Sequence, residues 1–359
     1  MKRDGASTPN LRRNPGVDAL RTLAILGMMS THTSRLIVYQ SREAWSHWGL
    51  LLEPLIPSLF LFLVGVSLNY SLARSESRSE NPRAWYLRQA RRALMLWLIG
   101  ALFSALEYGI RLPDVFLASG ILCTIAYSIL LLGAVLLLPF RGWVAALLLL
   151  GGSAAFFLVN RSGTYPFPWV SGDSPILPLS LFAAAGTLWG LWSLRKPVSI
   201  YLLAAPALVF VIWAVNHYGW LTLFTYPVGR SDATRVLAAP ITGGLAKVVG
   251  YYNLRPLLSL FCLCAHLAAL GIACLAFSRL KETWAGRLFI LGRHSLAIYI
   301  LHLSLLAILV VTLGLQPLKT PWQGNAVILG VICICLFWCF MREKWRSKRK
   351  LSQSLKSQL

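Results

Sequence analysis

Ten apolar segments, each near or above the length that a helix needs to cross a bilayer, dominate this chain of 359 residues. They cover residues 17–38, 49–73, 91–110, 114–137, 142–159, 176–194, 199–216, 256–277, 287–313 and 322–341. Only 13% of the residues are charged, whereas a soluble protein of this size carries about a quarter. The pattern predicts an all-α, polytopic membrane protein with ten transmembrane helices, surrounded by lipid.

The basic residues predict how the chain is oriented in the membrane. The formal net charge is +22, and most of the 34 lysines and arginines fall in segments that share a side with the N-terminus. Because basic residues accumulate on the cytoplasmic side, both termini are expected there, in the cell (inner) membrane. We do not expect nucleic acid as a partner, since no recognition motif accompanies the charge.

The chain is expected to form one membrane domain between two polar tails. Residues 1–15 are predicted to be a cytoplasmic tail, 16–341 the transmembrane domain, and 342–359 a basic cytoplasmic tail on the membrane surface. Residues 74–90 are interpreted as a charged cytoplasmic loop. The first apolar run lacks a small-residue cleavage site, so it is expected to remain as an anchor.

The cysteines indicate packing rather than chemistry. All seven lie within predicted spans, which favours small apolar side chains over disulfides or a metal site. The sequence contains no Gly-rich phosphate loop, HExxH or GxSxG motif, and no metal is expected.

Ionisable groups in the first apolar segment are the main functional signal. Arg21 and His32 are eleven residues apart, which on a helix means about 20° from the same face and a rise of about 16 Å. Polar groups at membrane depth are expensive and suggest function, and His titrates near physiological pH. The structural alternative is that Arg21 is an interfacial anchor paired with Asp18, and His32 a contact between helices.

Four motifs resemble those of transmembrane acyltransferases. The first helix reads GVDALRTLAILGMMSTH, similar to the Arg-x10-His signature that acyltransferase-3 proteins share with bacterial relatives of heparan-α-glucosaminide N-acetyltransferase. The second group is also resembled by PLIPSLFLFLVGVSLNYSLAR, by IRLPDVFLASGILCTIAYSILLL after a basic helix start, and by LGRHSLAIYILHL. The resemblance covers most of residues 16–137 and 286–306.

The resemblance implies membrane-embedded acyl transfer. Such transferases take an acyl group, here expected to be acetyl, from acyl-CoA on the cytoplasmic side. They pass it to a hydroxyl or amine of an extracytoplasmic glycan or glycolipid. Acyl-CoA is thus the expected co-substrate, the glycan is the expected acceptor, and the enzyme modifies glycans.

The catalytic residues implied by the resemblance are His32, Glu53 and His47. Glu53 stands where relatives tend to have Asp, and a carboxylate there could orient a histidine or bind an acceptor amine. His47 lies in the loop region of the proposed catalytic histidine of the eukaryotic enzyme. His32 is preferred as the base because proton transfer needs a positioned group in a dry site, but the choice between His32 and His47 stays open.

Contacts to the donor are expected from the basic residues at the cytoplasmic ends of the helices. Arg21 could meet CoA phosphates, since its fork suits phosphate, with further contacts from Arg91, Arg92 and Arg293. His302 is interpreted as a second buried polar group, on one face with Ser295 and Tyr299. Each also has an ordinary reading as an interfacial cation or a helix–helix hydrogen bond.

Two alternatives remain from other functional classes. A small-anion or solute transporter would fit the spans and buried charges, but the chain shows no internal repeat. A non-catalytic membrane scaffold would not explain why Arg21 and His32 lie on the same face of the first helix. The sequence leaves open the length of the acyl chain, the identity of the acceptor and whether the protein forms a homodimer. It also leaves open whether the acyl group is transferred directly or through an acyl-His intermediate.

Overall fold

The computed structural model describes residues 14–37, 45–108, 114–117, 120–162, 176–195, 199–218, 256–277, 279–280, 282–309 and 321–356. Within these ranges the chain is helical and holds no strand, which confirms the all-α fold. The helices are α1 (Pro15–Ile37), α2 (Trp45–Ser77), α3 (Pro82–Tyr108), α4 (Asp114–Leu117), α5 (Ile121–Leu136), α6 (Arg141–Ser162), α7 (Ile176–Arg195), α8 (Ser199–Tyr218), α11 (Pro256–Phe277), α12 (Glu282–Leu288), α13 (Ile290–Arg293), α14 (Ser295–Ala307) and α15 (Pro321–Lys356).

The chain is a polytopic membrane protein. Five of the described helical stretches are long and apolar enough to cross a bilayer: Leu55–Ser77, Arg141–Val159, Ile176–Leu194, Leu258–Phe277 and Trp322–Lys348. Three shorter helices are also apolar, Ile121–Leu136, Ala204–His217 and Ser295–Ala307. The count of ten spans and the cytoplasmic position of the termini stay predictions.

Two predicted spans are broken rather than continuous. The segment 114–137 contains α4 and α5, and Gly120 before α5 has a φ of 82°, a left-handed conformation that glycine adopts without a steric cost. The segment 287–313 contains the end of α12, then α13 and α14. Non-helical backbone at Phe289 and His294 separates these three helices. Apolar composition predicts the spans but not these interruptions.

Helices extend into two segments that the sequence suggests are a loop and a tail. In the stretch 74–90, α2 continues to Ser77 and α3 begins at Pro82, a residue suited to the first helical turn. The side-chain oxygen of Asn81 accepts a hydrogen bond from the backbone nitrogen of Arg83 at 2.9 Å, which caps α3. Beyond residue 342, α15 runs on as a helix to Lys356.

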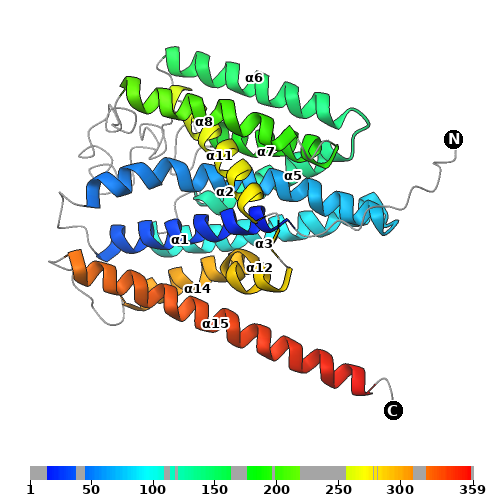
Figure 1. Cartoon of the computed structure of the whole chain (residues 1–359), viewed down its shortest axis with the longest axis vertical. Coiled ribbons are helices and arrows are strands. Elements are labelled where there is room, and N and C mark those ends of the chain that lie inside the picture. Colours follow the sequence, from blue (N-terminus) through cyan, green and yellow to red (C-terminus); the bar gives the residue numbers. More distant parts are fainter. Residues whose placement is uncertain are drawn as a thin grey trace. The chain divides into compact units, whose positions relative to one another are not determined.

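The chain separates into two compact units, and each is described by itself. The first includes Pro57–Gly271; in it α3 packs on α5, and α7 packs on both α5 and α6 (Figure 1). The second contains Asn14–Ile56 and Ile272–Leu359, and here α1 packs against α13, α14 and α15. The single membrane domain over 16–341 stays a prediction.

A buried asparagine joins two helices of the first unit. Asn69 of α2 donates through its side-chain nitrogen to the backbone oxygen of Gly65, at 3.0 Å, and to that of Thr187 in α7, at 2.9 Å. Its side chain is inside the unit, with 2% of the residue exposed. Polar bridges of this kind hold helices together where the hydrophobic effect contributes little.

Candidate active site

Helix α1 carries its polar groups on the face that it buries. Asn14 caps the helix, since its side-chain oxygen accepts a hydrogen bond from the backbone nitrogen of Gly16 at 2.9 Å. Asp18, Ile25 and Met28 are buried, and they lie on the stripe that the helical period predicts. The stripe that begins at Asp18 therefore belongs to the packed side of the helix.

Arg21 lies near the first turn of this stripe. Its Nη1 is 3.2 Å from the Oδ1 of Asp18, and a quarter (25%) of the Arg21 side chain remains exposed. The ion pair matches the interpretation of Arg21 as an interfacial anchor, and the exposed part of its guanidinium is of a kind that also contacts anions. Both uses are open to this side chain.

His32 meets His302 at the other end of the stripe. The Nδ1 of His32 lies 3.0 Å from the Nε2 of His302, which is fully buried in α14 (0% exposed). The Nδ1 of His302 lies 2.9 Å from the backbone oxygen of Ile298, one turn earlier in the same helix. Two imidazoles that the sequence separates by 270 residues thus form one hydrogen-bonded pair.

Tyr299 packs against both rings of this pair. Its ring centroid is 6.3 Å from that of His32 and 5.5 Å from that of His302, with edge-on geometry in both contacts. The two imidazole planes differ by 18°. The tyrosine therefore restricts how the imidazoles can turn.

A close backbone contact places α13 against the beginning of α1. The backbone nitrogen of Gly292 donates to the hydroxyl of Thr22 at 3.1 Å, and that hydroxyl donates to the backbone oxygen of Asp18 at 2.9 Å. A Cβ atom on Gly292 would lie 2.5 Å from the same Asp18 oxygen. The glycine of the LGR motif is therefore required by the approach of α1.

Arg293 follows directly in α13 and shares a carboxylate with its neighbour. The Oε1 of Glu343 in α15 lies 3.5 Å from the Nη1 of Arg293 and 3.0 Å from the Nε2 of His294. Arg293 keeps about a third (31%) of its side chain exposed. Arg21 and Arg293 are thus two partly exposed guanidiniums on segments that contact each other.

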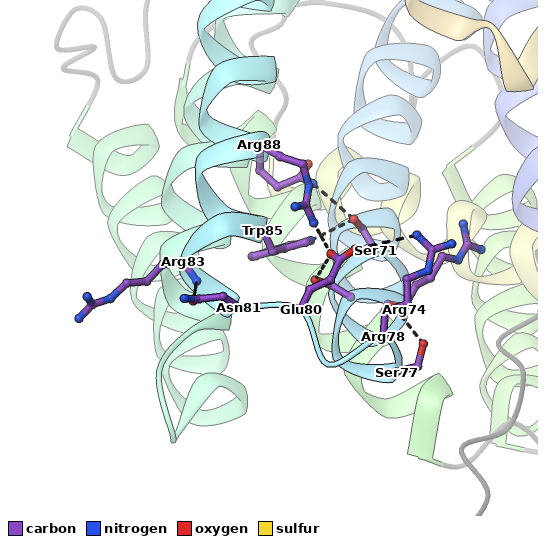
Figure 2. A network of polar contacts seen from close by, with 11 residues as sticks. Ser71, Arg74, Ser77, Arg78, Glu80, Asn81, Arg83, Trp85 and Arg88 are labelled. Carbon is purple, nitrogen blue, oxygen red and sulfur yellow. Dashed lines mark hydrogen bonds and ion pairs between the residues drawn. The ribbon is translucent and has the colours of Figure 1, made fainter.

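The turn between α2 and α3 carries a polar network of its own (Figure 2). The carboxylate of Glu80 accepts hydrogen bonds from the hydroxyl of Ser75, at 2.7 Å, and from the guanidinium of Arg88. The Ser75 hydroxyl and then Arg88 hold the pKa of Glu80 below its ordinary value. Figure 2 shows Arg83 pointing away from this carboxylate. The network fixes the turn between the two helices.

The predicted donor contacts Arg91 and Arg92 lie in the first unit. Both are exposed on α3, and within the described part of the chain neither forms an ion pair. The predicted catalytic residues His47 and Glu53 belong to the helical backbone of α2, but their side chains are outside the described residues. The structure therefore brings together His32 with His302, and leaves the roles of the others as predictions.

The structure contains a buried polar pair that the sequence did not predict. The hydroxyl of Ser58 in α2 lies 2.8 Å from the Nε2 of His266 in α11, and both residues are buried in the first unit. Phe62 and Phe182 pack against the imidazole. The sequence offers one signal for this pair, an ionisable residue within an apolar segment. Glu343 was also missed, although it is the single acid of the basic stretch after residue 341.

The arrangement in the second unit suits proton transfer beside a bound anion. A hydrogen-bonded imidazole pair can accept and return a proton, and guanidiniums bind phosphate groups. Among the residues that the structure describes, no three His, Cys, Asp or Glu side chains are grouped as metal ligands.

Comparison with known protein families shows which family the chain belongs to. The profile described as "Heparan-alpha-glucosaminide N-acetyltransferase, catalytic" matches residues 13–226, which include Arg21 and His32 but not His302. No curated protein matches the chain. Because the matched segment covers more than half of the 359 residues, the protein belongs to this family of membrane N-acetyltransferases that act on glycans.

Proposed function

We propose that this protein transfers an acetyl group from cytoplasmic acetyl-CoA to a hydroxyl or amine of an extracytoplasmic glycan or glycolipid. The observation that carries the proposal is the hydrogen-bonded pair of partly buried His32 and fully buried His302, with His32 on the same helix as the partly exposed Arg21. The family match supplies the reaction class, and this pair supplies a group that can perform it.

The donor would lie along α1. Arg21 and Arg293 would contact the phosphates of CoA, because both guanidiniums are partly exposed and lie on touching segments. From Arg21 to His32 the helix rises about 16 Å. An extended pantetheine arm is on the order of 15–20 Å, so its thioester would reach the histidine pair. Arg91 and Arg92, in the first unit, remain proposed phosphate contacts.

The acceptor would be activated by His32. As general base, His32 would take the proton of the acceptor hydroxyl or amine, which then attacks the thioester carbonyl directly. The same imidazole then returns the proton to the thiolate of CoA, so no acyl-enzyme is needed. Glu53 is proposed to orient the acceptor, and His47 is the competing base.

Acetyl-CoA binding to the detergent-purified chain tests the proposal, because a ligand that binds the native state raises its melting temperature. We expect stabilisation of the wild type and of His32→Ala, and a loss of stabilisation in Arg21→Ala. Arg161→Ala, at an exposed site at the end of α6, is the matched control and should behave as the wild type.

Turnover assigns the base. His32→Ala should lower kcat by about 10²- to 10⁴-fold, the range for a general base, with binding retained. If His47→Ala abolishes turnover while His32→Ala does not, His47 is the base instead. If neither acetyl-CoA nor a longer acyl-CoA stabilises the wild type, acyl transfer is contradicted and the transporter alternative is favoured.

A further inference from the structure

The hydrogen bonds around His302 determine which of its ring nitrogens carries the proton. Its Nδ1 lies 2.9 Å from the backbone oxygen of Ile298, and a carbonyl oxygen can only accept. The hydrogen must therefore be on Nδ1. Because His302 is fully buried and its described partners are uncharged, its neutral form is the one that the packing favours.

The state of His302 dictates the state of His32. A neutral imidazole has one N–H, so the Nε2 of His302 is an acceptor. The Nδ1 of His32, 3.0 Å away, must then be the donor of this hydrogen bond. In a neutral His32 the lone pair consequently resides on Nε2, the nitrogen on the opposite side of the ring from His302.

From this chain of hydrogen bonds we propose that His302 is a positioning residue, which holds His32 in the Nδ1–H tautomer and thereby keeps its Nε2 able to accept a proton. The inference rests on the proposed function, in which His32 is the base. It assigns His302 to the orientation of the base rather than to the binding of the donor. Tyr299, edge-on to both rings, supports that orientation.

The proton balance of the transfer follows from this tautomer. The acceptor O–H or N–H bond breaks and its proton moves to the Nε2 of His32. The acceptor atom forms a bond to the thioester carbonyl carbon, the C–S bond breaks, and the CoA thiolate takes the proton from Nε2. His302 accepts from the Nδ1–H of His32 throughout, including while His32 is cationic, so His32 returns to the tautomer in which it began.

Two substitutions of His302 separate the acceptor from the packing. Leucine fills the site without an acceptor, whereas glutamine offers an amide oxygen near the position of Nε2. We expect His302→Leu to lower kcat at least a hundredfold with a nearly unchanged KM for acetyl-CoA, the pattern of a lost transition-state interaction. His302→Gln should recover at least tenfold of that loss. Wild-type kcat in His302→Leu, or no recovery in His302→Gln, would overturn the proposal.

His266→Leu is the matched control for these variants. It also removes a buried histidine, hydrogen-bonded to Ser58 at 2.8 Å, and it lies in the first unit. It should lower the melting temperature yet leave kcat within a few fold of the wild type when assayed below that temperature. An equal loss in both leucine variants would show that the effect belongs to packing, which contradicts the positioning role.

A spectroscopic test does not depend on activity. Solid-state NMR of lipid-embedded protein, labelled with ¹⁵N in its histidine rings, reports which nitrogen carries the hydrogen, and a His32→Gln sample assigns the signals. At about pH 8 we expect His32 to be protonated on Nδ1 and not on Nε2. If this holds but acetyl-CoA is not turned over, the proposed function fails and the tautomer assignment stands. If turnover is observed with His32 protonated on Nε2, the assignment is wrong.

Discussion

Gly65 of α2 and Thr187 of α7 approach so closely that a Cβ atom on the glycine would lie 2.6 Å from the backbone nitrogen of Thr187. Gly186 of α7 repeats the relationship, since its Cβ would lie 2.8 Å from the carbonyl carbon of Phe62. Small residues at both sides allow the two backbones to meet, as is common where helices pack within membranes.

Alanine at either glycine should push helices α2 and α7 apart where they cross. Because the obstacle is backbone rather than a flexible side chain, we expect Gly65→Ala and Gly186→Ala each to destabilise the protein by about 2–3 kcal/mol or more. Thermal unfolding in detergent measures the effect. Gly151→Ala, in α6 with no atom near its Cβ position, is the control. Unfolding of Gly65→Ala at the same temperature as Gly151→Ala would contradict the close crossing.

The turn around Glu80 should loosen in acid. Its pKa in the folded protein lies below the ordinary value of 4.5, chiefly because of the Ser75 hydroxyl and Arg88. The contribution of this carboxylate to stability is therefore complete above pH 4.5 and is lost as the pH falls through the folded pKa.

Hydrogen exchange of residues 75–92, corrected for the intrinsic rate at each pH, checks this expectation. Protection should decline in the wild type below that pH, whereas Glu80→Gln should be less protected at neutral pH and insensitive to acid. Glu76→Gln, which removes the exposed partner of Arg141, is the control that keeps the acid response. The same acid response in Glu80→Gln would assign the titration to another group.

Two side chains donate hydrogen bonds to the backbone carbonyl of Phe116 in α4, and we expect their contributions to stability to be coupled. It accepts hydrogen bonds from the Nε1 of Trp97, at 2.9 Å, and from the hydroxyl of Tyr127, at 2.6 Å. Tyr127→Phe alone should cost about 1 kcal/mol, since the second donor remains. Combined with Trp97→Phe, the cost should exceed the sum of the single costs by about 1 kcal/mol, because the carbonyl then has neither donor. Additive costs in a double-mutant cycle would show that the two donors act independently.

Glu343 should weaken the attraction of Arg293 for a phosphate group. In Glu343→Gln this guanidinium loses its carboxylate at 3.5 Å, and we expect about fivefold tighter binding of acetyl-CoA, roughly 1 kcal/mol. The melting temperature should hardly change, since a half-exposed ion pair contributes little. Calorimetric titration gives the affinity, and Arg293→Ala with Glu343→Gln should cancel the gain. An unchanged affinity in Glu343→Gln would remove Arg293 from the donor site.

Local patterns in the sequence predicted the helices and the buried face of α1. The helical period puts Asp18, Ile25 and Met28 on one face, and the structure buries all three. Periodicity also placed Ser295, Tyr299 and His302 on one face of α14, where Tyr299 and His302 meet His32. These features depend on residues within a few turns of each other, which is the range that a sequence pattern covers.

The pairing of His32 with His302 could not be predicted in the same way. It depends on how α1 and α14 pack, and no local period connects residues so distant along the chain. The breaks at Gly120 and His294 were missed for a related reason. Composition reads them as part of apolar runs, whereas the backbone there leaves the helix. The contacts of Glu343 with Arg293 and His294 likewise depend on how α15 packs beside α13.

The length of α15 has a consequence for where its basic end lies relative to a bilayer. Its 36 residues extend for about 54 Å, well beyond a hydrocarbon core of about 30 Å. After the apolar stretch the same rod carries alternating basic side chains, and Glu343 is its single acid. Long cations tolerate both headgroups and water. Where its apolar stretch crosses a hydrocarbon core, about 24 Å of the helix would extend beyond that core, so one continuous rod would pass from the lipid through the headgroups into water.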